Sequence, residues 1–152
     1  MELSKNACST LNDLIETSKN GEQGFRLAAE HAHDPQLKSL LQKYADDCAR
    51  GASELQQCVT QFGGKPEERG TAAGAAHRAW MNLRTAVTKD DDGAILDECE
   101  RGEDHAKAIY QKALKDGLPP QVRELVQRQY QGVVEHHDRI RDLRSTHEHV
   151  TH

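Results

Sequence analysis

The stretch Glu98-Cys99-Glu100-Arg101-Gly102-Glu103-Asp104-His105 lies in a long run of helix-forming residues, and its pattern decides the fold that we predict. Glu103 falls on the same helical face as Cys99, Ala106 and Tyr110, so we expect its carboxylate to point into a protein core. A carboxylate in a core is costly unless a cation, an arginine or a proton balances it. The stretch therefore predicts a buried polar centre in a helical protein. It does not decide whether a cation, an arginine or a proton balances the carboxylate.

The composition of the chain favours an all-α fold. Of its 152 residues only 4% are aromatic and 30% are charged, and the helix-forming Ala, Leu, Gln, Glu, Lys and Arg are abundant. The length suits a single domain over residues 1–152, with a packed core at about 10–144 and a frayed tail at 145–152. The net charge of −5 and the lack of a basic stripe argue against nucleic acid as a partner.

Capping and turn residues divide the chain into five predicted helices. Ser9 or Thr10 can cap the first helix, and Asp34-Pro35 can end it and begin the second. Gly63-Gly64-Lys65-Pro66 can end the second helix, and the turn at 116–120 separates the last two. The predicted helices span about 10–33, 35–62, 72–89, 94–115 and 119–144.

A short internal repeat indicates how these helices pack. Residues 35–43 match residues 120–128 in chemical type, and a Gly-Glu pair precedes each copy, at Gly21-Glu22 and at Gly102-Glu103. We therefore expect two helical hairpins related by a pseudo-two-fold axis, with the helix at 72–89 as the crossover between them. Because this crossover spans the bundle, the second and fourth helices should run parallel. Such a connection is that of a ferritin-like four-helix bundle.

Four polar side chains are predicted to meet at one level of the bundle: Glu22, Glu100, Glu103 and His137. Carboxylate oxygens and imidazole nitrogens are ligands that iron and manganese accept, so these residues form a candidate metal site. Tyr44 and Asp47 are expected near the same level.

The spacing of these residues departs from that of ferritin-like di-iron proteins, which carry Glu-x-x-His on each of two helices. Here Val134 lies three residues before His137, and Arg50 lies three residues after Asp47. A second possibility is therefore a structural network in which Arg50, Arg101 or a histidine neutralises the inward carboxylates. A third is a small-molecule pocket at this level.

Glycines also gather near this level of the predicted bundle. A glycine in a helix interior costs roughly 1 kcal/mol against alanine, so we expect the group to allow close helix approach or to open a pocket. Its members are Gly21, Gly24, Gly51, Gly102 and Gly132. On the crossover, His77 and Trp80 share a helical face, and we expect both to be packed core residues.

The cysteines Cys8, Cys48, Cys58 and Cys99 have no CxxC spacing, and Cys48 and Cys58 would lie about 15 Å apart on one helix. We therefore predict four reduced thiols. No apolar run approaches the length of a membrane span, and the first residues lack the apolar part of a signal peptide. We expect a cytoplasmic protein that has no membrane partner.

Four motifs together carry a resemblance that extends over about residues 11–144: Gly21-Glu22-x-Gly24-Phe25, His77-Arg78-x-Trp80, Glu100-Arg101-Gly102-Glu103-Asp104 and His137-Asp138-Arg139. In these motifs the chain resembles a bacterial family of ferritin-like four-helix-bundle proteins of unknown function. The resemblance implies the ferritin-like fold and no established reaction. More distant ferritin-like relatives bind two metals and handle oxygen or peroxide.

Two functions are expected from these observations. The first is a non-enzymatic or vestigial ferritin-like protein, with stress as one setting, that acts as a homo-oligomer or through a protein partner. The alternative is a metal protein for oxygen or peroxide handling or for metal storage. In that case iron or manganese would be the cofactor, held by Glu22, Glu100, Glu103 and His137. Neither function defines a reaction or a substrate.

Overall fold

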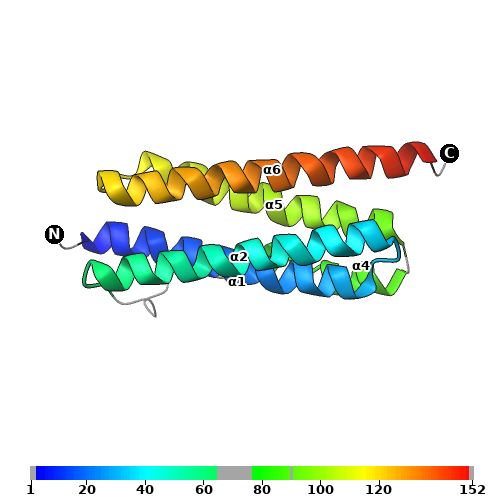
Figure 1. The fold of residues 1–152 in the computed structure, drawn as a ribbon, viewed down its shortest axis with the longest axis horizontal. Helices are drawn as coiled ribbons and strands as arrows, with labels where there is room; N and C mark the ends of the chain where they lie inside the picture. Colours follow the sequence, from blue (N-terminus) through cyan, green and yellow to red (C-terminus); the bar gives the residue numbers. More distant parts are fainter. Residues whose placement is uncertain (1–2, 65–76, 90, 151–152) are drawn as a thin grey trace.

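The computed structural model describes residues 3–64, 77–89 and 91–150, and within these ranges all the regular structure is helical, as predicted. Long helices lie side by side in these residues, and we call them the core helices (Figure 1). They are α1 (Lys5–His31), α2 (Pro35–Gln61), α5 (Asp92–Lys115) and α6 (Pro120–Val150). The short helix α4 (Leu83–Ala86) and the 3-10 helix η1 (Val87–Lys89) come before α5.

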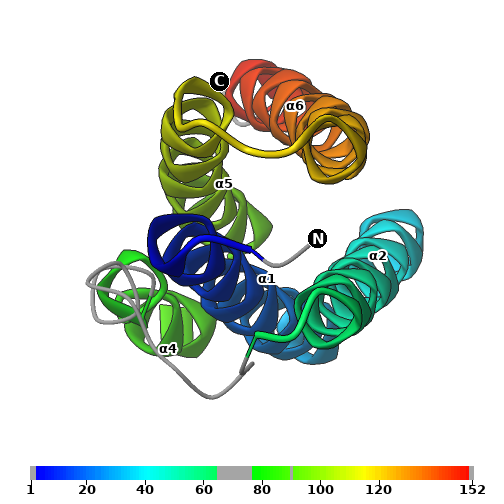
Figure 2. The ribbon, with the colours of Figure 1, turned by 90° about the vertical axis from the view of Figure 1, so that its left-hand side faces the viewer.

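The direction of the core helices follows the prediction. In Figure 1, α2 and α5 run one way along the bundle, and α1 and α6 run the other way. The chain thus forms two antiparallel hairpins, α1–α2 and α5–α6, and α1 packs against α5. Seen along the bundle in Figure 2, α4 lies on the outside of α1 and α5, which it contacts.

Polar contacts tie the two hairpins together at both ends of the bundle. At one end, the Asp92 carboxylate accepts hydrogen bonds from the backbone N–H groups of His33 (2.8 Å) and Asp34 (3.0 Å), so the start of α5 holds the α1–α2 turn. At the other end, the Thr10 hydroxyl donates to Asp116 at 3.0 Å. These contacts fix the register of one hairpin on the other.

The first core helix begins earlier than predicted. Ser4, and not Ser9 or Thr10, is the N-cap, and its hydroxyl accepts a hydrogen bond from the N–H of Ala7 at 3.0 Å. The reason is that the apolar stripe continues toward the N-terminus, where Ala7 and Cys8 are buried in the core. The helix also ends at His31, before the predicted His33.

The starts of α2 and α6 agree better with the prediction. Asp34 caps α2 by accepting from the N–H of Gln36 at 2.9 Å, and Pro35 is its first residue. Pro120 is the first residue of α6, one place after the predicted Pro119. However, α6 continues to Val150, beyond the predicted end at about residue 144.

The crossover is not the continuous helix that was predicted over 72–89. Residues 72–76 lie outside the described residues, and a turn at 80–82 interrupts the helix before α4. At this turn the Trp80 indole enters the bundle, where it is 8% exposed and packs edge-on against Phe25. A Cβ at Gly24 or Gly102 would lie 2.2 or 2.3 Å from the indole, so glycine is needed on both helices that flank it.

This arrangement confirms the prediction that Trp80 is a core residue and gives two of the helical glycines a role. The prediction for its neighbour His77 is wrong, because His77 is exposed. The cause is the turn at residue 80, which breaks the helical face that the two side chains would otherwise share.

The core consists of two apolar clusters along the bundle axis, and polar residues lie between them. One cluster surrounds Phe25 and Ile140, and the other surrounds Leu14 and Val126. On α5, the first cluster ends at Cys99 and the second begins at Tyr110, so Glu103 falls between them. A polar centre at the level of Glu103 therefore divides the core, and the predicted inward position of Glu103 is confirmed.

Over residues 3–64, 77–89 and 91–150, no helix is both long and apolar enough to cross a membrane. In the same residues Met81 is the only large hydrophobic side chain that is exposed, at 54%. All four cysteines are free, as predicted.

Candidate functional site

A cavity of about 240 Å³ opens among the core helices at the level of the polar centre. Each core helix lines it with a polar side chain: Ser18 of α1, Cys48 of α2, Tyr110 of α5 and His136 of α6. The small residues Gly51 and Gly132 also line it, and a Cβ at Gly132 would meet nothing within 4 Å. The cavity therefore exists partly because α2 and α6 carry glycine where they face it.

On the α2–α6 side of the centre, His136 forms a pair with an aspartate. Its Nε2 lies 3.0 Å from Oδ2 of Asp47, and its ring stacks on Tyr44 with 3.9 Å between the ring centroids. The His136 Nδ1 atom is buried and has no hydrogen-bond partner in the described part of the chain. Burial lowers the pKa of His136, although Asp47 opposes that shift. The lowered pKa favours a neutral His136 imidazole, and the Asp47 carboxylate orients it.

A second chain of hydrogen bonds crosses the centre from α1 to α2. The Tyr110 hydroxyl lies 3.4 Å from the Ser18 hydroxyl and donates to the Gln129 side-chain oxygen at 2.8 Å. The Gln129 amide in turn donates to the backbone oxygen of Gly51 and to Glu54, both at 3.2 Å. Burial raises the pKa of Tyr110, so this residue acts as a neutral hydrogen-bonding group.

Glu103 is the deepest acidic group of the centre. Its side chain is 2% exposed, and its Oε2 atom has no hydrogen-bond partner among the described residues. Burial, and to a lesser extent the negative charge of Asp104, raise the pKa of Glu103 to about 8. A raised pKa favours the protonated carboxyl group at neutral pH, and a proton is one of the three partners that the sequence left open.

The thiols next to this centre are unreactive by the same physical cause. Burial raises the pKa of Cys48 well above its ordinary range, and the negative charges of Glu103, Asp47 and Glu22 add to the effect. Burial also raises the pKa of Cys99. Since the thiolate is the nucleophile, these two cysteines are poor candidates for covalent chemistry.

Glu100 and Asp104 of α5 and Arg144 of α6 form a separate cluster with His137. The His137 Nε2 atom lies 2.6 Å from Oδ1 of Asp104 and 3.8 Å from Oε1 of Glu100. Arg144 reaches the other oxygen of Glu100 at 3.0 Å. Glu100 and His137, two of the four predicted metal ligands, are thus brought together, but they are already paired with groups of the protein.

The other two predicted ligands do not join this cluster. Glu22 lies at the edge of the bundle, where it is 30% exposed and pairs with Arg26 at 2.8 Å one turn along α1. The guanidinium of Arg26 also contacts Asp46 at 3.2 Å, which draws the group outward. No hydrogen bond or ion pair joins Glu22 to Glu103, although both are described residues.

The arginines proposed as counter-charges are also occupied elsewhere. Arg50 lies 3.4 Å from Asp47, and Arg101 lies 3.7 Å from Glu98, each one turn away on its own helix. Neither of them pairs with Glu103. Over residues 3–64, 77–89 and 91–150, no group of three or more His, Cys, Asp or Glu side chains is arranged to hold a metal ion.

His136 is a residue of the centre that was not predicted from the sequence. The apolar stripe of α6 predicts that the next residue, His137, points inward, and His137 is indeed buried. One residue on a helix is a rotation of about 100°, which turns His136 toward Tyr44 and Asp47 and His137 toward α5. The available signal was the expected position of Tyr44 and Asp47 at this level, since both contact His136.

The fold and the centre define this molecule as an all-α bundle protein with a polar centre between two apolar clusters. Residues 6–116 match the model of a family described as "Domain of unknown function (DUF2383)", and the chain belongs to this family. A search of curated proteins gave no match. The matched part includes Glu22, Glu100 and Glu103, whereas α6 with His136 and His137 follows it.

Proposed function

We propose that this protein is a ferritin-like bundle with no reaction of its own, which acts as a homo-oligomer or through a protein partner. The observation that carries the proposal is that the acidic groups at the centre are either paired with a side chain of the protein or, at Glu103, have a pKa raised by burial. Arg26 pairs with Glu22, His136 with Asp47, and Arg144 with Glu100, while a proton neutralises Glu103. Such a centre fixes the register of the core helices.

The parallel arrangement of α2 and α5 and the crossover between the hairpins support the ferritin-like assignment. The residues present do not fit a ferritin-like metal centre, however. Such a centre uses Glu-x-x-His on two helices, whereas α2 carries Asp47 followed by Arg50 at that spacing. The Asp47 carboxylate is bound to His136, and Glu22 faces Arg26.

Metal addition tests this proposal against the metal-binding alternative. The protein is stripped with a chelator, its tail residues His147, His149 and His152 are replaced by asparagine, and its thermal midpoint is measured with Fe²⁺ or Mn²⁺. A specific metal ligand set would raise the midpoint by mass action. We expect no rise. A rise of several degrees that disappears in Glu103→Gln would overturn the proposal in favour of the metal protein.

Self-association is tested separately by light scattering of the full chain. We expect a particle mass of at least twice the 17.0 kDa of the chain over a range of protein concentrations. A monomer at all concentrations would contradict the homo-oligomer and leave only the version with a protein partner.

A further inference from the structure

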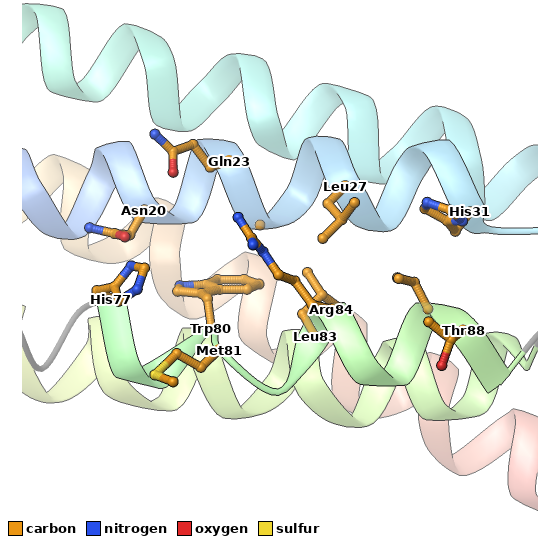
Figure 3. A pocket seen from close by; sticks show the side chains of 12 residues that line it. Asn20, Gln23, Leu27, His31, His77, Trp80, Met81, Leu83, Arg84 and Thr88 are labelled. Atoms are coloured by element: carbon orange, nitrogen blue, oxygen red, sulfur yellow. The ribbon is translucent and has the colours of Figure 1, made fainter.

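A second cavity, larger than the one at the polar centre, lies on the other side of α1. It has a volume of about 640 Å³ and lies between α1 and the segment 77–89 that contains α4 (Figure 3). Along α1 it extends from Asn20 to His31, which is about 16 Å at the helical rise per residue. This volume falls within the range of small-molecule sites, and the shape is that of a groove. We call it the crossover groove.

The crossover groove has an apolar floor. Leu27 of α1 and Leu83 and Val87 of the crossover segment line it, together with the ring of Trp80. Trp80 is fixed in place, since its other contacts lie between Gly24 and Gly102 inside the bundle. A ligand that lies along this floor would therefore contact a preformed surface, which lowers the entropic cost of binding.

Arg84 is the only Lys, Arg, Asp or Glu side chain among the described residues that line the crossover groove, and two histidines line it as well. Figure 3 shows Arg84 extending from α4 toward α1, with His77 at one end of the groove and His31 at the other. None of its lining residues in the described part of the chain is Asp or Glu, although the chain holds 25 acidic against 20 basic residues. Arg84 forms no ion pair with any described residue, so its guanidinium is available to an anion.

We propose that the crossover groove binds a small organic carboxylate with an unbranched apolar chain, of the medium-chain fatty-acid class. The chain lies along Leu27, Trp80 and Leu83, and the carboxylate is held by Arg84. The elongated apolar floor favours a chain over a compact ring, and the basic lining favours an anion over a neutral or cationic head. This inference is independent of the proposed function, because it uses none of the groups at the polar centre.

The test uses the intrinsic fluorescence of the full chain, since Trp80 is its single tryptophan and forms the floor of the groove. Decanoate is titrated against wild type, and decanol serves as the neutral probe of equal chain length. We expect a saturable change with decanoate and binding of decanol that is weaker by about tenfold. Arg84→Gln should weaken decanoate by a similar factor and leave decanol unchanged.

Arg78→Gln is the matched control, because Arg78 is exposed on the same segment and does not line the groove. It should bind decanoate as wild type does. No saturable change, equal binding of decanol and decanoate, or equal loss in both arginine variants would each overturn the proposal. The proposal would also be overturned if wild type formed a dimer that Met81→Glu disrupts and bound no decanoate. A second copy of the chain would then be the occupant of this groove.

Discussion

Glu100 and Glu103 lie three residues apart on α5, and both are buried, but their negative charges are handled in different ways. Glu100 receives Arg144 at 3.0 Å and lies 3.8 Å from His137. Glu103 has an oxygen without a hydrogen-bond partner in the described residues, and its pKa is raised to about 8. The same side chain is therefore part of an ion pair at one position and a neutral acid at the next turn.

The difference depends on whether a cationic side chain of a neighbouring helix can reach each glutamate. Arg144 is 36% exposed, so its long side chain can reach Glu100 while part of the guanidinium stays in water. Glu103 lies between the two apolar clusters, where a cation would have to give up its hydration almost completely. A proton carries no such cost, since the neutral acid needs far less solvation than the ion.

The largest expected effect of this difference is a dependence of stability on pH. In the folded state the pKa of Glu103 is raised from an ordinary 4.5 to about 8, so the folded protein binds more protons between these values. The contribution of Glu103 is fully present below pH 4.5 and is lost as pH rises toward 8. The free energy of unfolding of Glu103→Gln, measured in urea, should equal that of wild type near pH 5. At pH 8.5 it should be higher than that of wild type by about 3 to 5 kcal/mol.

Glu100→Gln is the matched control for this experiment, because it makes the same change one turn away and leaves Glu103 intact. Its unfolding free energy should keep the wild-type slope between pH 5 and 8.5. If Glu103→Gln and wild type differed by the same amount at every pH, the proton on Glu103 would be excluded as the source of the slope.

An intermediate effect is expected at the other neutral group of the centre, His136. Asp47→Asn replaces the carboxylate that faces its Nε2 atom at 3.0 Å. Asp47 is 28% exposed, so we expect a loss of about 1 to 2 kcal/mol at pH 7.5, measured by urea unfolding. Asp46→Asn, which changes the preceding and more exposed carboxylate, should cost less. An equal loss in both variants would show that the Asp47–His136 pair contributes no more to the free energy of unfolding than the exposed Asp46 does.

The smallest effect is expected at the paired carboxylate. Arg144→Gln removes the ion pair with Glu100, but Arg144 is partly in water and the gain from such pairs is modest. We expect a loss of about 0.5 to 1 kcal/mol that shrinks when salt is raised, because salt screens the wild-type pair. A loss larger than that of Asp47→Asn would mean that the Arg144–Glu100 pair stabilises the protein more than the Asp47–His136 pair does. A loss independent of salt would mean that salt does not screen the Arg144–Glu100 pair. Either result would contradict this prediction.

The sequence predicted those parts of this comparison that depend on helical periodicity and capping. The face shared by Glu103, Cys99 and Tyr110 placed Glu103 in the core, and Asp34 and Pro35 marked the start of α2. Periodicity alone could not decide the state of Glu103, because this depends on which side chains of other helices reach it. The arginines considered, Arg50 and Arg101, pair with acids on their own helices instead.

The errors have similar causes. Glu22 was expected inside, but Arg26 one turn away on the same helix holds it at the edge, and the i,i+4 spacing of this pair was the signal that was overlooked. His137 is buried, as the stripe of α6 predicts, but His136 was missed because it lies about 100° further round the helix, outside that stripe. The break in the crossover was missed because Trp80 leaves the helix to fill space made by Gly24 and Gly102, which belong to two other helices.

The most direct test of this account is the protonation state of Glu103 itself, measured by infrared or ¹³C NMR spectroscopy with labelled glutamate side chains. We expect one protonated glutamate at pH 6.5, which ionises near pH 8 and is missing from Glu103→Gln but present in Glu100→Gln. Full ionisation of every glutamate at pH 6.5 would contradict the account, because Glu103 would then need a cation that none of the described side chains supplies.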